Sequence, residues 1–364
     1  MHGGDNTSMV SRVAQVVIVL VALVAALAPI DPATVERWFS IGIYPRIQRA
    51  LTPVSNLVPF ALFDLLTIGA GLLVIVVVVR GIRAAWRLRQ WRPLVKTLAG
   101  VLTAVAAGYL VFLMVWGFNY RRVPMSERLV LDRPTPTVAD AVRLGLVAVE
   151  RLNALHGPAH DGGWHTDPHT DNALRTAFAQ VQGLLSEAPA AVPGRLKSSL
   201  YGYYFRWSGV DGMVDPFALE VIGNPDLLPW EIPFVAAHEW AHLAGYAEES
   251  DASFVGFLTC LRGSVEAQYS AWLSLYWQIV GESGPEERTR LAQALEDGPR
   301  RDINAVVARM ERGQLPWLRT ASWRVYDSYL RANRVEEGVK SYGAVLTLIL
   351  RARFEDGWTP VRRE

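Results

Sequence analysis

The chain has almost no cysteine and almost no net charge. Its 364 residues include a single cysteine, Cys260. One cysteine excludes an internal disulfide and a cysteine-based zinc finger, and a lone cysteine in an apolar segment is expected to be a small buried core residue. Lysine and arginine total 36 and acidic residues total 35, which gives a net charge of +1. This balance leaves no basic excess for a nucleic-acid partner, so we expect none.

Charged residues are scarcest near the N-terminus, where the apolar residues gather. Three apolar runs occupy residues 13–30, 57–79 and 97–117. Each run is close to the roughly 20 residues that a helix needs to cross the hydrocarbon layer of a membrane. Asp64 lies near one end of the second run, where an acid can reach the membrane interface. We therefore predict a membrane domain over residues 1–117, with three transmembrane helices and the lipid bilayer as a partner.

The segment between the second and third runs predicts the orientation in the membrane. Residues 80–96 contain no acid and six basic side chains, which are Arg80, Arg83, Arg87, Arg89, Arg92 and Lys96. Loops rich in lysine and arginine stay on the cytoplasmic side. The third run then leaves residues 118–364 on the other face. We predict a multi-pass protein of the cell membrane whose C-terminal domain is extracytoplasmic.

The C-terminal domain has the pattern of a mainly helical structure. Thr137 with Asp140 three residues later is typical of a helix N-terminus, and residues 171–187 form a second amphipathic pattern. Between these helices, residues 156–170 combine glycine, proline, aspartate and four histidines. This composition predicts a solvated loop rather than a metal site.

The segment "PFVAAHEWAHLAGYAEESDASF" contains two histidines four residues apart, with a glutamate beside the first. Residues four apart share one face of an α-helix, so His238 and His242 can direct their imidazoles at one ion. Glu239 lies one step round the helix and can reach a water at that ion without being a ligand. This is the logic of the H-E-x-x-H motif. We predict a Zn²⁺ site with His238 and His242 as ligands and Glu239 as general base.

A catalytic zinc needs a third protein ligand. Gly245 can end the first helix in a left-handed turn, after which Glu248, Glu249 and Asp251 compete for the third position. Glu248 completes a spacing that resembles the metzincins. Glu249 begins a segment that resembles the E-x-x-A-D helix of many membrane zinc peptidases, with Ser253 in the position of the bracing aspartate. We favour Glu249 and place Glu248 second.

The chain also resembles the bacterial membrane proteins of domain-of-unknown-function family 3810. The resemblance is carried by "WGFNYRRVP" at residues 116–124, by residues 215–260 and by residues 325–350. It implies a zinc metallopeptidase-like protein. The family usually shows Glu-x-Glu-Ala-Asn-Phe after the metal helix, and residues 249–254 read Glu-Ser-Asp-Ala-Ser-Phe. The first glutamate is kept, which supports Glu249 as a ligand.

Together these patterns predict a mostly α-helical protein, with three transmembrane helices and a mainly helical zincin-like (gluzincin-like) domain that contains a short β-sheet. The expected function is a membrane-anchored zinc metallopeptidase acting on a peptide or protein substrate of the cell envelope. A non-catalytic zinc-stabilised binding or assembly module, and a zinc amidase acting on a cell-wall fragment, stay open. Residues 218–223 are either an edge strand that receives an extended peptide or a core strand. Tyr326, Tyr329 and Tyr342 are candidate donors to the transition-state oxygen.

Overall fold

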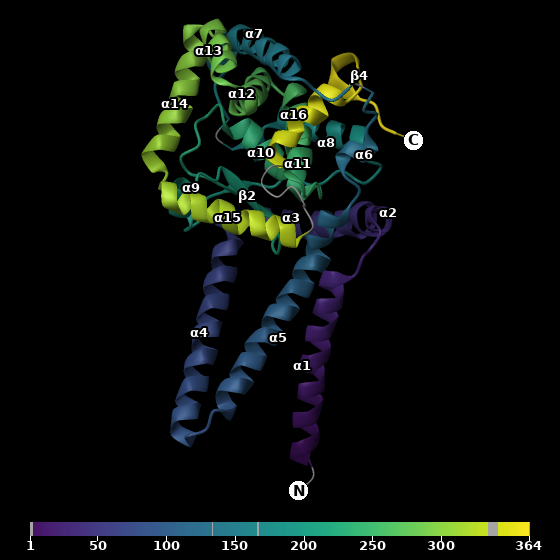
Figure 1. The fold of residues 1–364 in the computed structure, drawn as a ribbon, viewed down its shortest axis with the longest axis vertical. Helices are drawn as coiled ribbons and strands as arrows, with labels where there is room; N and C mark the ends of the chain where they lie inside the picture. Colours follow the sequence, from purple (N-terminus) through teal and green to yellow (C-terminus); the bar gives the residue numbers. More distant parts are fainter. Residues whose placement is uncertain (1–2, 133, 166, 334–340, 364) are drawn as a thin grey trace.

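Three long helices project from one end of a helical domain (Figure 1). The computed structural model describes residues 3–132, 134–165, 167–333 and 341–363. Two of the long helices are long and apolar enough to cross a membrane, and a third span is counted if the bent pair Arg12–Leu27 and Pro32–Asn56 is taken as one. These two or three candidate spans agree with a protein associated with a membrane, and the number of three spans stays a prediction. The long helices are α1 (Gly3–Leu27), α4 (Leu62–Leu88) and α5 (Arg92–Val115).

The basic segment between the second and third runs is mostly helical, not a loop. Helix α4 continues through Leu88, and α5 begins at Arg92. Arg89 ends α4 in a left-handed conformation, with φ of 51°. The turn therefore takes only a few residues, and it lies at the end of the two helices farthest from the helical domain (Figure 1).

A bent segment connects α1 to α4 and packs under the helical domain. It consists of α2 (Pro32–Val35), the π-helix η1 (Glu36–Ile43) and α3 (Tyr44–Asn56). Thr52 of α3 donates its hydroxyl to the carbonyl of Leu219 at 2.8 Å. Residues from the N-terminal third of the chain thus contact the C-terminal part directly, and the domain boundary at residue 117 stays a prediction.

The helical domain surrounds two central helices, α10 and α11, which pack against each other. Around them lie the helices of both the middle and the end of the chain (Figure 1). Besides the three-stranded sheet, the helical domain consists of η2 (Gly117–Arg121), α6 (Met125–Arg128), α7 (Val138–Gly162), η3 (Pro168–Thr170), α8 (Asn172–Leu185), α9 (Gly202–Ser208), α10 (Ile232–Leu243), α11 (Glu249–Leu261), α12 (Val265–Glu282), α13 (Pro285–Ala294), α14 (Asp297–Gly313), α15 (Pro316–Ala332), α16 (Ser341–Arg351), β4 (Phe354–Glu355), η5 (Asp356–Trp358) and β5 (Thr359–Pro360). The prediction of a mostly α-helical protein is confirmed, and Cys260 is fully buried in the core as expected.

Helix α7 begins as predicted but ends later than predicted. Thr137 and Asp140 form a capping box at its N-terminus. The helix then continues through Pro158 to Gly162, so the prediction of a loop over residues 156–170 is wrong for residues 156–162, about two helical turns. Ala159 is completely buried in the core. Packing of this turn against the domain overrides the local helix-breaking tendency of glycine and proline.

A three-stranded sheet lies beside the central helices, in the order β1 (Leu196–Lys197), β3 (Glu220–Gly223) and β2 (Gly212–Asp215). Strand β3 pairs in parallel with β1 and antiparallel with β2, and all four of its residues are buried. The strand expected at residues 218–223 is therefore the centre of the sheet, and the edge-strand alternative is wrong for it. Strands β1 and β2 form the two edges of this sheet.

Two buried carboxylates join the start of α4 to this sheet. Asp64 accepts the hydroxyl of Ser199 at 2.5 Å and the backbone N–H of Leu200 at 2.8 Å. Glu220 accepts the backbone N–H of Phe63 at 2.8 Å and forms an ion pair with Lys197 at 2.6 Å, in which both side chains have no exposed area. Asp64 is thus a structural anchor at the end of its helix.

We expect Lys197→Met to destabilise the protein by about 3–5 kcal/mol, because it leaves the Glu220 charge buried without its partner. The measurement is the midpoint of thermal unfolding of the full chain in detergent. Arg143→Met is the matched control, since Arg143 pairs with Asp140 at the surface, where an ion pair contributes little. Equal unfolding temperatures for the two variants would contradict the assigned role of the buried pair.

Candidate metal centre

Helix α10 (Ile232–Leu243) carries the H-E-x-x-H residues and is held at both ends. At its start Pro233 occupies the first turn, and the backbone N–H of Phe234 donates to the hydroxyl of Ser270 at 3.0 Å. At its end, the hydroxyl of Tyr44 donates to the carbonyl of Leu243 at 2.7 Å, and the indole of Trp116 donates to the carbonyl of His242 at 3.1 Å. Residues of the bent segment and of the end of α5 thus add hydrogen bonds to the last carbonyls of α10, where intrahelical partners run out.

Helix α11 (Glu249–Leu261) returns along α10 after a tight turn. Gly245 makes that turn with φ of 86°, as the sequence predicted. A Cβ on Gly256 would lie 3.1 Å from the backbone nitrogen of His238. The missing side chain at Gly256 therefore permits the close approach of the two helices, and this approach brings Glu249 to the histidines.

Three ligand-type atoms converge between α10 and α11. The Oε2 atom of Glu249 lies 3.1 Å from Nε2 of His238 and 3.5 Å from Nε2 of His242, and the two Nε2 atoms are 3.2 Å apart. A tetrahedral zinc with bonds of about 2.0–2.1 Å would hold its ligand atoms roughly 3.3 Å apart. The group can therefore hold a metal ion at the centre of the three atoms.

The other ring nitrogens of both histidines are held by oxygen atoms. Nδ1 of His242 donates to the carbonyl of Tyr246 at 2.7 Å, and Nδ1 of His238 lies 3.2 Å from the hydroxyl of Ser253. Because a carbonyl only accepts, a neutral His242 directs its Nε2 lone pair at the carboxylate of Glu249. Such an arrangement of lone pairs requires a proton or a cation between them, and fixing Nδ1 is how proteins orient histidine ligands.

The short distances between these side chains shift the pKa values of His242 and Glu249. Burial by itself lowers the pKa of His242, but the neighbouring Glu249 carboxylate outweighs it and raises the pKa to about 9. Burial by itself raises the pKa of Glu249, but the two histidines outweigh burial and hold this pKa well below the usual range. The group thus attracts positive charge at neutral pH, and a bound metal ion would take the place of the protons.

Glu239 lies beside the group and is not part of it. Its side chain is buried, and its Oε2 atom has no hydrogen-bond partner among the residues that the structure describes. Burial raises its pKa, with the histidines acting against this effect. A Cβ on Gly212 of strand β2 would lie 2.6 Å from Oε1 of Glu239. Glycine at this edge strand therefore leaves space for the carboxylate.

The structure separates the three acids that compete for the third position. Glu249 is the acid grouped with both histidines. Asp251 accepts the backbone N–H of Met125 at 3.1 Å, and burial raises its pKa to about 6. Glu248 precedes α11 as its N-cap residue in an extended conformation and is not one of the grouped residues.

One of the three candidate tyrosines reaches this group. The hydroxyl of Tyr326, on α15 (Pro316–Ala332), donates a hydrogen bond to Oε1 of Glu249. Tyr329 stacks on the ring of Tyr326 at 6.2 Å and packs against Tyr120. The side chain of Tyr342 lies outside the described residues. No local pattern distinguished Tyr326, because its contact with Glu249 spans 77 residues of sequence.

The fold and this group define a class of protein: a mostly helical protein with two or three helices long and apolar enough to span a membrane, and a buried His/His/Glu group that could hold a metal ion. The chain belongs to the family described as "Protein of unknown function (DUF3810)", whose sequence pattern matches residues 39–350. The match contains every residue of the group and the ends of the membrane helices that hold it. No curated protein and no solved structure matches the chain.

We expect Glu249→Ala to lower the zinc affinity of this group by more than about 100-fold, the upper end of what losing a residue that merely orients a ligand costs. Competition titration of the full chain against a chromogenic chelator measures the affinity. Glu248→Ala is the matched control and should leave the affinity within a few-fold of the parent. The reverse order of the two variants would make Glu248 the third ligand.

Proposed function

We propose that this protein is a membrane-anchored zinc metallopeptidase that hydrolyses peptide bonds in or near the cell envelope. The observation that carries the proposal is the convergence of His238 Nε2, His242 Nε2 and Glu249 Oε2 beside Glu239, whose Oε2 atom has no hydrogen-bond partner within the described part of the chain. Two imidazoles and one carboxylate are the protein ligands of many catalytic zinc sites, which leave a fourth position for water or substrate.

His238, His242 and Glu249 would hold the zinc, which when bound would supply Lewis acidity to polarise a substrate carbonyl and to bring the pKa of a water close to 7. Glu239 accepts a proton as the water oxygen bonds to the carbonyl carbon, and it returns the proton to the amine nitrogen as the C–N bond breaks. The raised pKa of Glu239 suits both halves of this transfer, because a carboxyl group nearer neutrality is a better acid–base catalyst than a fully exposed one.

Strand β2 (Gly212–Asp215) supports a peptide as the substrate. It forms one edge of the sheet, and its first residue, Gly212, lies against Glu239. An extended peptide that pairs with this edge would run past the catalytic carboxylate with its backbone held by main-chain hydrogen bonds. This edge takes the peptide-binding role that one of the two alternatives gave to residues 218–223.

Tyr326 is assigned a positioning role through Glu249. Its hydroxyl binds the oxygen of Glu249 that faces away from the two histidines. A ligand carboxylate held in this way keeps its other oxygen directed at the metal. Of the two candidate tyrosines whose side chains are described, Tyr326 is the one whose hydroxyl lies at the group. A tyrosine hydroxyl has one proton, so Tyr326 would have to release Glu249 before it could donate to the transition-state oxygen.

The proposed location follows from the two ends of the membrane helices. The basic turn between α4 and α5 lies at one end, and the domain that contains His238 and His242 lies at the other (Figure 1). Basic turns stay in the cytoplasm as a rule, which supports an extracytoplasmic location for the domain. Trp116, at the end of α5, donates to the carbonyl of His242, which supports a site close to the membrane surface.

We expect Glu239→Gln to lower the rate of peptide hydrolysis by about 10²–10⁴-fold, the usual contribution of a positioned acid–base group, while zinc binding is kept. The full chain in detergent is loaded with zinc and incubated with a mixed-sequence peptide library, and mass spectrometry identifies the new termini. Glu248→Gln is the matched control and should keep the activity of the parent.

The same assay separates the other two functions. A zinc-loaded parent protein that cleaves no peptide, and whose zinc only raises the unfolding temperature, is a binding or assembly module. A parent protein that cleaves no peptide but releases amines from cell-wall fragments is an amidase. Either result rejects the peptidase proposal, and so does a Glu239→Gln variant with full peptidase activity.

A further inference from the structure

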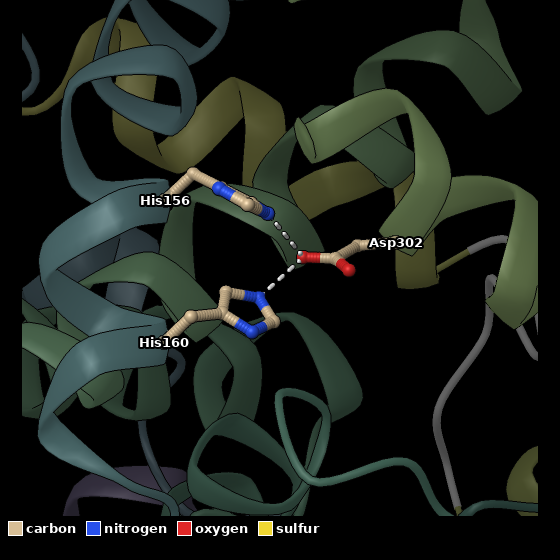
Figure 2. A group of neighbouring side chains, drawn as sticks. All are labelled: His156, His160 and Asp302. Carbon is tan, nitrogen blue, oxygen red and sulfur yellow. Dashed lines mark hydrogen bonds and ion pairs between the residues drawn. The ribbon is translucent and has the colours of Figure 1, made fainter. Parts of the chain in front are cut away.

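A second group of metal-ligand side chains, two histidines and an aspartate, lies far in sequence from the H-E-x-x-H helix. His156 and His160, four residues apart, project from the same face of α7 toward Asp302 of α14 (Figure 2). Oδ2 of Asp302 lies 2.9 Å from Nε2 of His160 and 3.6 Å from Nε2 of His156. These values bracket the roughly 3.3 Å expected between two ligands of a tetrahedral zinc.

The backbone is shaped to bring these side chains together. Helix α7 continues through Pro158, which keeps His156 and His160 one helical turn apart. In the first turn of α14, a Cβ on Gly298 would lie 2.6 Å from Nδ1 of His156. Glycine at position 298 therefore lets α14 approach the imidazole closely enough to present Asp302.

The surroundings of Asp302 resemble those of a metal ligand. Asp302 is 6% exposed, and its Oδ2 atom accepts the hydroxyl of Tyr269, on α12, at 2.6 Å. Proteins orient ligand carboxylates with such hydrogen bonds. The rings of Trp164 and Trp230 lie 5.4 and 5.7 Å from that of His160 and shield one side of the group.

Hydrogen bonding alone does not account for the geometry. Oδ2 of Asp302 already accepts from Tyr269 and is within hydrogen-bond distance of His160. His156 stands 3.6 Å from the same oxygen, which is too long for a hydrogen bond. Its imidazole is nonetheless directed at the point that the other two ligand atoms share (Figure 2). One cation at that point would contact all three residues.

We propose that His156, His160 and Asp302 form a second metal site, which binds a divalent transition metal of the zinc class through the two Nε2 atoms and Oδ2. Two imidazoles and one carboxylate favour such metals, whereas Mg²⁺ and Ca²⁺ need a shell of oxygen atoms. The side chains of His156 and His160 are 22% and 31% exposed, which leaves room for water as a further ligand.

The second metal ion joins three helices of the domain. It binds α7 and α14 directly and reaches α12 through Tyr269. Helix α14 also carries Arg309, which pairs with Glu231 at 2.6 Å, directly before the first residue of α10. The ion therefore stabilises the packing that supports the start of the H-E-x-x-H helix. This role is structural and does not rest on the proposed peptidase activity.

The test counts metal in a chain whose first group has been removed. The full-length His238→Ala/His242→Ala variant in detergent is stripped with chelator, exposed to Zn²⁺, desalted and measured by mass spectrometry of the metal. We expect one zinc per chain, and none after His160→Ala is added. His165→Ala, which removes an exposed histidine of the following loop, is the matched control and should keep one zinc. Equal zinc content in the His160 and His165 variants would overturn the proposal.

A second readout covers a variant that fails to fold. Asp302→Asn keeps an acceptor for Tyr269 but removes the charge, and His156→Gln leaves the contact between His160 and Asp302 intact. In the same background, added Zn²⁺ should raise the unfolding temperature of the parent and of His165→Ala but not of these two variants. A zinc-dependent rise of the same size in all four proteins rejects the site.

Discussion

The close packing of α10 against α11 is the constraint on which the first metal centre depends. Gly256 lets the two backbones approach, and the approach places the Glu249 carboxylate at two imidazoles whose other nitrogens are already occupied. Burying a carboxylate costs free energy unless it is paired. Two lone-pair-bearing rings and a carboxylate in one buried place are stable together only with positive charge between them, which is why the centre is suited to a metal ion.

The membrane helices are part of the same construction. Tyr44 and Trp116 bind the last carbonyls of α10, and the guanidinium of Arg122 donates to the carbonyl of Gly245 at 2.8 Å while pairing with Glu36 at 2.7 Å. The turn that follows the H-E-x-x-H helix is thus held by the bent segment between α1 and α4 and by the residues that follow α5. A rigid support of this kind keeps the side chains of a site in place more accurately than a flexible linker would.

Several features were predictable because they depend on neighbouring residues. The capping box at Thr137, the turn at Gly245 and the apolar helices each follow from a local pattern, and the structure contains them. The predictions that were wrong or left open concern contacts between segments far apart in the sequence. Residues 156–162 have the composition of a loop, yet packing keeps them helical, and residues 218–223 have the composition of a strand without any signal that a neighbour covers each side.

The amino-acid order determined that His238 and His242 share one helical face with Glu239 next to them, since the period of an α-helix is a property of the local backbone. Folding in three dimensions decided that Glu249 rather than Asp251 meets those rings, that Tyr326 contacts it, and that Asp302 joins a second pair of histidines. These meetings depend on how closely whole helices pack, and the contacts that set the packing lie far apart along the chain.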